Sequence, residues 1–79
     1  MISLPSLKPK QVLRALLRAG FYIHHQTGSH ARLFHQTKPH LRVTIPIHSK
    51  EIPRATLSRI LKQAGLSKKE FLKYLKRKR

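Results

Sequence analysis

The sequence predicts a two-layer α+β domain in which helices cover one face of a small antiparallel sheet. Apolar residues repeat at helical spacing near both ends of the chain, and three strand-like segments joined by polar turns lie between them. The chain has 79 residues and no cysteine, which is enough for one domain with a small core. We therefore expect a single domain over residues 1–79.

The first helix is expected to begin at Lys8-Pro9 and to end at Gly20. Proline is tolerated in a first helical turn, where its missing N–H has no partner, and glycine is common directly after a helix. The apolar residues of this helix recur three and four positions apart: Val12, Leu13, Leu16 and Leu17. Residues 1–7 are expected to be a loose lead-in.

Three strands are expected over residues 21–26, 30–35 and 41–47. The first two flank Thr27-Gly28-Ser29, which is typical of a tight turn, with Gly28 available for a positive φ. The third alternates apolar and polar residues, so that four side chains should face the core: Leu41, Val43, Ile45 and Ile47. Pro46 lacks a ladder donor, which indicates an edge strand or a frayed end.

Strand alternation decides which side chains reach the open face of this sheet. Ala31 and Leu33 are expected to face the helices, so His30, Arg32 and Phe34 face outwards. Phe34 complicates this pattern, because a slipped register would bury it. For both Phe34 and Tyr22 we expect core packing in preference to stacking on bases.

A second helix is expected from about Pro53 to Gly65, with a buried stripe formed by Leu57, Ile60, Leu61 and Ala64. Ser67 and Glu70 form a capping-box pattern at the start of a short third helix. That helix carries Phe71, Leu72 and Leu75 and belongs to a basic extension over residues 68–79, whose last four residues are expected to fray.

Charge narrows the range of partners. Eighteen Lys and Arg residues stand against two acidic ones, Glu51 and Glu70, for a net charge of +16. This imbalance favours nucleic acid or an acidic protein as a partner. Because the basic residues are spread along the chain, binding to a membrane surface is disfavoured. No signal peptide or membrane span is apparent, so a cytoplasmic location is expected.

The chain contains six histidines: His24, His25, His30, His35, His40 and His48. Four of them, His25, His30, His35 and His40, recur every five residues. A metal site is nevertheless disfavoured, since the chain has no cysteine and no carboxylate lies near these four in sequence. Strand neighbours such as His24 and His25 should also point to opposite faces. We expect no metal and no cofactor.

The scarcity of carboxylates also limits the chemistry. A magnesium-dependent nuclease needs several Asp or Glu ligands, and a Ser-His-Asp site needs the aspartate that this chain lacks. A variant of that site with Glu in place of Asp is formally possible. If the protein cuts a nucleic acid, the natural route without a metal is cleavage of RNA, because the substrate's own 2′-OH is the nucleophile. A neutral histidine can remove its proton while Lys or Arg stabilises the charge on phosphate. DNA lacks the 2′-OH and would not be cut in this way.

The residues carry a resemblance to the HicA family, the small toxins of HicA–HicB toxin–antitoxin pairs. Four segments carry it in order: Gly20-Phe21 with Gln26-Thr27-Gly28-Ser29-His30, Val43-Thr44-Ile45-Pro46-Ile47-His48, Thr56-Leu57, and Ile60-Leu61-Lys62-Gln63-Ala64-Gly65-Leu66-Ser67. The resemblance covers about residues 8–67. It implies a fold similar to double-stranded-RNA-binding domains, ribosome-independent cleavage of mRNA, His30 as the catalytic residue, and a HicB antitoxin that masks this site.

Further roles follow for residues near His30 and on the second helix. Gly28 and Ser29 are expected to shape the turn that positions His30. Candidate RNA contacts are Arg32, Lys50, Arg54 and His48, of which His48 is also a candidate second proton-transfer group. Residues 68–79 are expected to add RNA affinity or to contact the antitoxin.

Two alternatives from other classes remain. A non-catalytic RNA-binding module of double-stranded-RNA-binding type, or a toxin that has lost its nuclease activity, would bind through phosphate contacts and would keep its affinity without His30. A DNA-binding module is disfavoured because no helix-turn-helix pattern is apparent.

Overall fold

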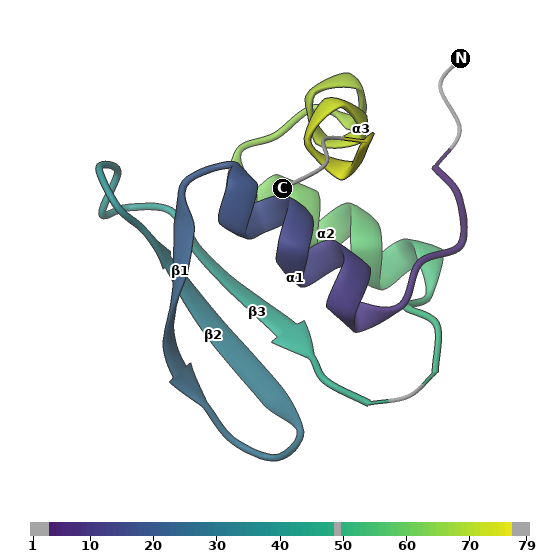
Figure 1. Cartoon of the computed structure of the whole chain (residues 1–79), viewed down its shortest axis with the longest axis horizontal. Coiled ribbons are helices and arrows are strands. Elements are labelled where there is room, and N and C mark those ends of the chain that lie inside the picture. Colours follow the sequence, from purple (N-terminus) through teal and green to yellow (C-terminus); the bar gives the residue numbers. More distant parts are fainter. Residues whose placement is uncertain (1–3, 49, 77–79) are drawn as a thin grey trace.

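The chain folds in the order helix, three strands, helix, helix, and the computed structural model describes residues 4–48 and 50–76 (Figure 1). The elements are α1 (Pro9–Arg18), β1 (Phe21–Gln26), β2 (His30–His35), β3 (Arg42–Pro46), α2 (Arg54–Ala64) and α3 (Lys68–Lys76). The predicted order and type of the elements are confirmed, with β3 one residue shorter at each end than expected. Of the last four residues, expected to fray, Lys76 ends α3 and 77–79 lie outside the described residues.

The strands form one antiparallel sheet in the order β1–β2–β3, and α1 and α2 lie on one of its faces (Figure 1). Along β2, Ala31 and Leu33 are buried while His30 and Arg32 are exposed. Within residues 4–48 and 50–76, no helix covers the other face of the sheet, which we call the open face. This arrangement confirms the predicted two-layer α+β class and is consistent with the fold of double-stranded-RNA-binding domains.

The core lies between the two layers. In α1, Ala15 is fully buried, whereas Leu17, at the margin of the predicted apolar stripe, is 41% exposed. The predicted stripe of α2 is buried in full. The buried apolar side chains form one cluster: Leu4, Leu7, Val12, Ala15, Leu16, Phe21, Ala31, Leu33, Val43, Ile45, Ile52, Leu57, Ile60, Leu61, Ala64 and Phe71.

The N-terminal segment belongs to this core. Leu4 and Leu7 are buried, and the Leu7 carbonyl accepts a 2.8 Å hydrogen bond from the N–H of Ile52. For residues 4–7 the expected loose lead-in is therefore wrong, because Leu4 and Leu7 are part of the core cluster and the Leu7 backbone is bonded to the segment before α2. Residues 1–3 lie outside the described residues.

A bulge in β1 changes which histidines reach the open face. The register with β2 shifts between Ile23 and His25, which leaves His24 without a partner strand residue. The His24 ring stacks on Phe34, and His25 pairs with Arg32, so both histidines lie on the open side. The expectation that His24 and His25 point to opposite faces is therefore wrong, because it assumed an unbroken strand.

Two aromatic residues expected in the core lie on the open face instead. Tyr22 pairs with Phe34 across the sheet, and their rings meet edge to face with centroids 6.3 Å apart. Tyr22 is 41% exposed and Phe34 is half-buried. Alternation along β2 had placed Phe34 outwards, and Tyr22 lies opposite it on β1. The expectation of core packing for these two residues is wrong.

The edge of β3 that does not pair with β2 lies against α2, and we call it the free edge. The side-chain oxygen Oε1 of Gln63 accepts a 3.2 Å hydrogen bond from the Thr44 N–H, which points away from β2. Pro46 lies two residues further along, so its nitrogen also faces this free edge. Its missing N–H therefore removes no hydrogen bond between β2 and β3. The predicted edge position of this strand is confirmed.

The junction between α1 and β1 depends on Gly20. Its φ is 102°, and a Cβ at this position would lie 2.7 Å from Nε2 of His35. The Nδ1 atom of His35 accepts hydrogen bonds from the N–H groups of Thr37 and Lys38, so Nε2 carries the proton and donates to the Ala19 carbonyl. This histidine joins the end of α1 to the loop after β2.

Replacing Gly20 with alanine is expected to destabilise the fold by about 1–3 kcal/mol, because the backbone conformation is strained for an L-residue and the new methyl group meets His35. Urea unfolding followed by circular dichroism measures this change. The matched control is Gly28→Ala, where nothing lies within 4 Å of the added Cβ and φ is not positive. From the sequence, a positive φ is expected at Gly28, and that expectation is wrong. Equal destabilisation by the two substitutions would contradict the argument.

The capping box predicted at the start of α3 is present. The N–H of Ser67 donates to Oε1 of Glu70 at 2.9 Å, and the N–H of Glu70 donates to Oγ of Ser67 at 3.1 Å. These bonds from the Ser67 backbone and side chain lower the pKa of the Glu70 carboxyl. Since the folded pKa lies below the unfolded one, the stabilisation is complete above the unfolded pKa and disappears as the pH falls through the folded value.

Substituting Glu70 with glutamine is expected to lower the melting temperature at neutral pH and to make little difference in acid. The gap between wild type and variant should close as the pH falls below 4.5, the ordinary pKa of this carboxyl. Thermal melts across this range measure the gap. Glu51→Gln is the matched control, since the Glu51 carboxylate makes no hydrogen bond to the described residues. A gap that widens in acid would contradict the prediction.

Candidate functional site

The turn between β1 and β2 is held by the side chain of Thr27. Its Oγ1 accepts hydrogen bonds from the N–H groups of Ser29 and His30, at 3.3 and 3.1 Å. The Thr27 N–H donates to the His30 carbonyl at 2.9 Å, which closes the turn. The sequence places Thr27 in this turn but assigns the positioning of His30 to Gly28 and Ser29. The side-chain hydrogen bonds of Thr27 were not predicted, although threonine is a known turn residue for this reason.

His30 is the first residue of β2 and is exposed at the end of this turn. Its Nδ1 lies 3.0 Å from Oγ of Ser29, within hydrogen-bond distance. In the tautomer that carries its proton on Nδ1, that N–H donates to Ser29, and the lone pair of Nε2 is free to accept a proton. Nε2 makes no hydrogen bond within the part of the chain that the structure describes.

A groove of about 450 Å³ opens beside His30, between the end of the sheet and α2. His48, at the exit from β3, lies on the groove together with Arg59 of α2. The hydrogen bond from Thr44 to Gln63 ties the two walls together. The lining residues are His30, Thr44, Pro46, His48, Pro53, Thr56, Arg59 and Gln63.

His30 also borders a second hollow, of about 360 Å³, on the open face of the sheet. Arg32, two residues further along β2, lines this hollow with His25, Thr27 and Thr44. His30 therefore lies where the groove beside α2 meets the open face. A chain-like ligand on the sheet would reach the groove by passing this histidine.

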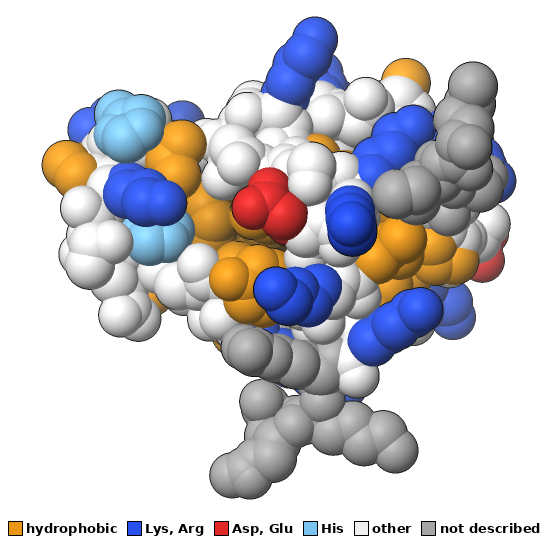
Figure 2. Space-filling model, turned by 90° about the horizontal axis from the view of Figure 1, so that it is seen from above, with side chains coloured by type: hydrophobic (Ala, Val, Ile, Leu, Met, Phe, Trp, Pro, Cys, Tyr) orange, Lys and Arg blue, Asp and Glu red, His pale blue; other side chains and the backbone are white. Residues whose placement is uncertain are grey.

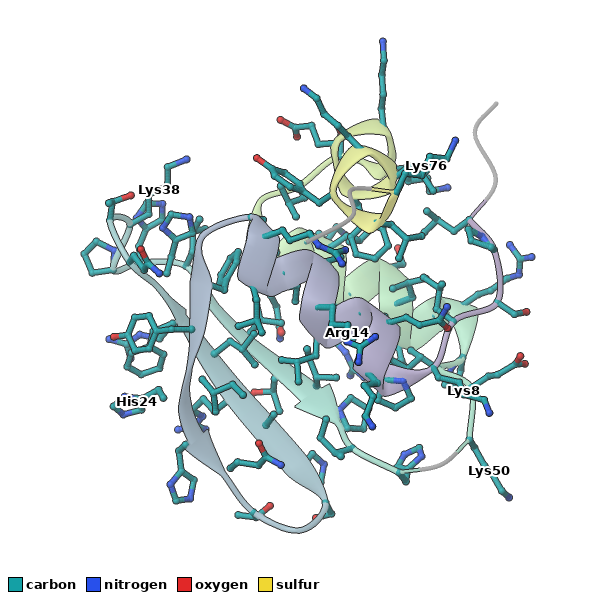
Figure 3. The ribbon with its side chains drawn as sticks, in the orientation of Figure 1. Lys8, Arg14, His24, Lys38, Lys50 and Lys76 are labelled. Atoms are coloured by element: carbon teal, nitrogen blue, oxygen red, sulfur yellow. The ribbon has the colours of Figure 1, made fainter. Side chains whose placement is uncertain are left out.

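The structure brings some of the candidate residues together and leaves others apart. His48 shares the groove with His30, and Arg32 shares the second hollow with it. Lys50 and Arg54 are exposed and line neither, and Figure 3 shows Lys50 pointing away from the protein into solvent.

Arg59 is a groove residue that sequence reasoning missed. It lies on the face of α2 that also carries Thr56 and Gln63, at positions i, i+3 and i+7. This spacing is visible in the sequence beside the buried stripe of the same helix. What the sequence does not show is that this face lies against the edge of β3, opposite His30.

Each of the two hollows around His30 contains one arginine, Arg59 in the groove and Arg32 in the second hollow. Figure 2 shows further Lys and Arg side chains spread over another face of the molecule, the one that carries α3. The two carboxylates of the chain, Glu51 and Glu70, line neither hollow. Among residues 4–48 and 50–76, no group of three or more His, Cys, Asp or Glu is placed to share a metal ion. Over the same residues, no helix has the length and apolar character needed to cross a membrane.

Comparison with protein families gives a match over most of the chain. The model of the family described as the HicA toxin of bacterial toxin–antitoxin systems matches residues 9–66. This range extends from the first residue of α1 to just before α3 and includes the His30 turn and the groove. A comparison with curated proteins found no match. With more than half of its length matched, the chain belongs to the HicA toxin family.

Proposed function

We propose that this toxin is a metal-independent endoribonuclease that cleaves mRNA without the ribosome, with His30 as its general base. One observation carries the proposal. His30 is exposed where two hollows meet, its Nδ1 is held by Ser29, and Arg59 and His48 line the same groove. A base, its orienting partner and a cation near the reaction site are the parts that RNA cleavage through the 2′-OH requires.

In the proposed reaction, Nε2 of His30 takes the proton of a ribose 2′-OH. The 2′-oxygen then bonds to the adjacent phosphorus as the bond from phosphorus to the 5′-oxygen breaks, which leaves a 2′,3′-cyclic phosphate and a 5′-hydroxyl. The leaving 5′-oxygen takes a proton from His48 in its imidazolium form or from water, which the open groove admits. Ser29 is a positioning residue in this scheme, since it acts through the His30 ring.

In this scheme, arginine side chains stabilise the negative charge that builds on the phosphate. Arg59 reaches the groove from α2, and Arg32 lies beside His30 on the open face. Guanidinium groups bind phosphate oxygens through paired N–H donors and stay charged at any physiological pH. The absence of carboxylates from both sets of lining residues supports chemistry that needs no divalent ion.

Membership in the family supports a HicB-type antitoxin as the protein partner. We propose that this antitoxin covers the groove and so blocks access to His30. Both Arg59 and Arg32 offer it cationic contacts next to the site. In this scheme, adding antitoxin stops cleavage and also displaces bound RNA.

Purified protein incubated with a long single-stranded RNA in EDTA tests the proposal. We expect cleavage, with product ends that are 2′,3′-cyclic phosphate and 5′-hydroxyl. DNA of the same sequence is the matched substrate control, and it should remain intact. Binding of RNA without cleavage would reject the enzyme and leave an RNA-binding module. Cleavage that requires a divalent ion, or that also cuts the DNA, would reject the proposed chemistry.

A further inference from the structure

The open face of the sheet carries an aromatic cluster at the end away from His30. The ring of Phe34 lies at its centre, with the imidazole of His24 stacked on it at a centroid distance of 4.0 Å and an interplanar angle of 9°. The guanidinium carbon of Arg42 lies 4.8 Å from the Phe34 centroid, and Tyr22 meets the same ring edge to face. Figure 3 shows His24 on the side of the sheet opposite the helices.

Core packing does not explain this cluster. The core lies on the other face of the sheet, where Phe21 supplies the large ring of β1. The bulge at His24 is what brings a second β1 ring to the open side, next to Tyr22. Flat rings held together at a solvent-facing surface are typical of a binding site, because solvent exposure of an aromatic cluster gains the fold little.

The charges around the rings indicate the class of ligand. Arg42 contacts Phe34, and Arg32 lies two residues before Phe34 on the same face. None of the three strands contains Asp or Glu. Rings beside guanidinium groups match single-stranded nucleic acid, whose bases stack on rings while its phosphates meet the cations. An acidic peptide would use the cations but would have no use for stacked rings.

We propose that His24, Phe34 and Arg42 form a platform on which unpaired bases of RNA stack. A base meets the outer face of the exposed His24 ring, because the inner face of that ring already lies on Phe34. The inference deepens the proposed nuclease function, since it describes how the same RNA is held beyond the cleavage site. Phe34 follows His30 by four residues on one face of β2, which places it about 13 Å along the strand. An RNA chain lying along β2 therefore passes from the platform over Arg32 to His30.

This placement has a kinetic consequence. The platform holds nucleotides that are not at the scissile bond, so it contributes to RNA affinity and leaves the chemical step unchanged. Stacking needs bases that are not already paired, so the platform favours single strands over duplex. It also acts on every base, because each has a flat face, and it adds little sequence preference.

Binding to a non-cleavable RNA tests the platform separately from catalysis. The probe is a fluorescent 2′-O-methyl RNA of about 12 unpaired nucleotides, within the usual range of single-strand sites, and its blocked 2′ position prevents cleavage. A second probe has the same backbone with abasic residues. Phe34→Leu removes the ring that supports His24 from beneath. This loss of the platform is expected to weaken binding of the first probe by about 5- to 150-fold, the range found for single stacking contacts. It should leave binding of the abasic probe unchanged.

Two further variants separate stacking from charge. Phe34→Tyr keeps a ring and should bind the base-bearing probe as wild type does. Arg42→Gln should reduce the slope of log affinity against log salt by about 0.7, the value for one contact with a single strand. Phe34→Leu should leave that slope unchanged, because it removes no charge.

Three outcomes of these binding experiments decide whether the cluster is a stacking platform for RNA. Equal affinity of wild type for the base-bearing and abasic probes overturns the platform, even if Phe34→Leu does not fold. Unchanged RNA binding by folded Phe34→Leu together with lost antitoxin binding would also overturn it and would assign the cluster to the protein partner. Loss of stacking affinity in a protein that cuts no RNA would support the platform while rejecting the nuclease.

Discussion

His30→Ala is expected to lower the rate of RNA cleavage by about 100- to 10,000-fold, the usual contribution of a general base. The affinity for RNA should change little, because His30 is one side chain at the junction of two cation-lined hollows and phosphate contacts carry most of the binding. Single-turnover cleavage in EDTA measures the rate. Anisotropy with the 2′-O-methyl RNA measures the affinity of the same preparations.

The matched control for this experiment is His40→Ala. His40 is an exposed histidine in the loop between β2 and β3, and it lines neither hollow. Its substitution should leave the cleavage rate unchanged. If His30→Ala still cuts at the wild-type rate, the assigned base is wrong, and His48 in the same groove becomes the residue to replace.

Phe71→Ala is expected to cost about 3–5 kcal/mol of folding free energy, the range for removing a buried aromatic side chain. Phe71 is 0% exposed, although it belongs to α3, which lies beyond the matched family range of residues 9–66. Since small domains have only about 5–15 kcal/mol of total stability, the variant should be unfolded to a measurable extent at 37 °C. Urea denaturation followed by circular dichroism gives the value.

Lys69→Ala is the matched control, since Lys69 is exposed on the same helix. It should change the free energy of unfolding by less than about 0.5 kcal/mol. A loss below about 1 kcal/mol for Phe71→Ala, against the 3–5 kcal/mol expected for a buried ring, would mean that α3 contributes little to the stability of the core.

A hydrogen bond also joins α3 to α1: Nη1 of Arg18 donates to the Tyr74 carbonyl at 3.0 Å.

This role of α3 is absent from the sequence-based expectations. The capping-box pattern predicted the helix, and the density of lysine suggested contacts with RNA or an antitoxin. The structure adds that one side of the helix closes the core through Phe71. A short amphipathic segment has the same sequence pattern whether its apolar side meets its own domain or a partner, so only the tertiary structure separates these cases.

The sequence by itself determined the elements and the faces of the sheet. Helical and strand periods are local properties, so Ala31 and Leu33 were placed in the core and His30 and Arg32 outside it without knowledge of the fold. The short-range pair of Ser67 and Glu70 was determined in the same way. The scarcity of carboxylates, which disfavours a magnesium-dependent nuclease, is read from the composition alone.

The tertiary structure decided what depends on register and on contacts between distant segments. One extra residue in β1 brings His24 onto Phe34, and a bulge of this kind leaves no reliable signal in a single sequence. Arg59 reaches the groove because α2 packs along the edge of β3, where Gln63 bonds to Thr44 across 19 residues. Periodicity gives the direction of a side chain from its own element, but what lies opposite it is set only when the elements pack.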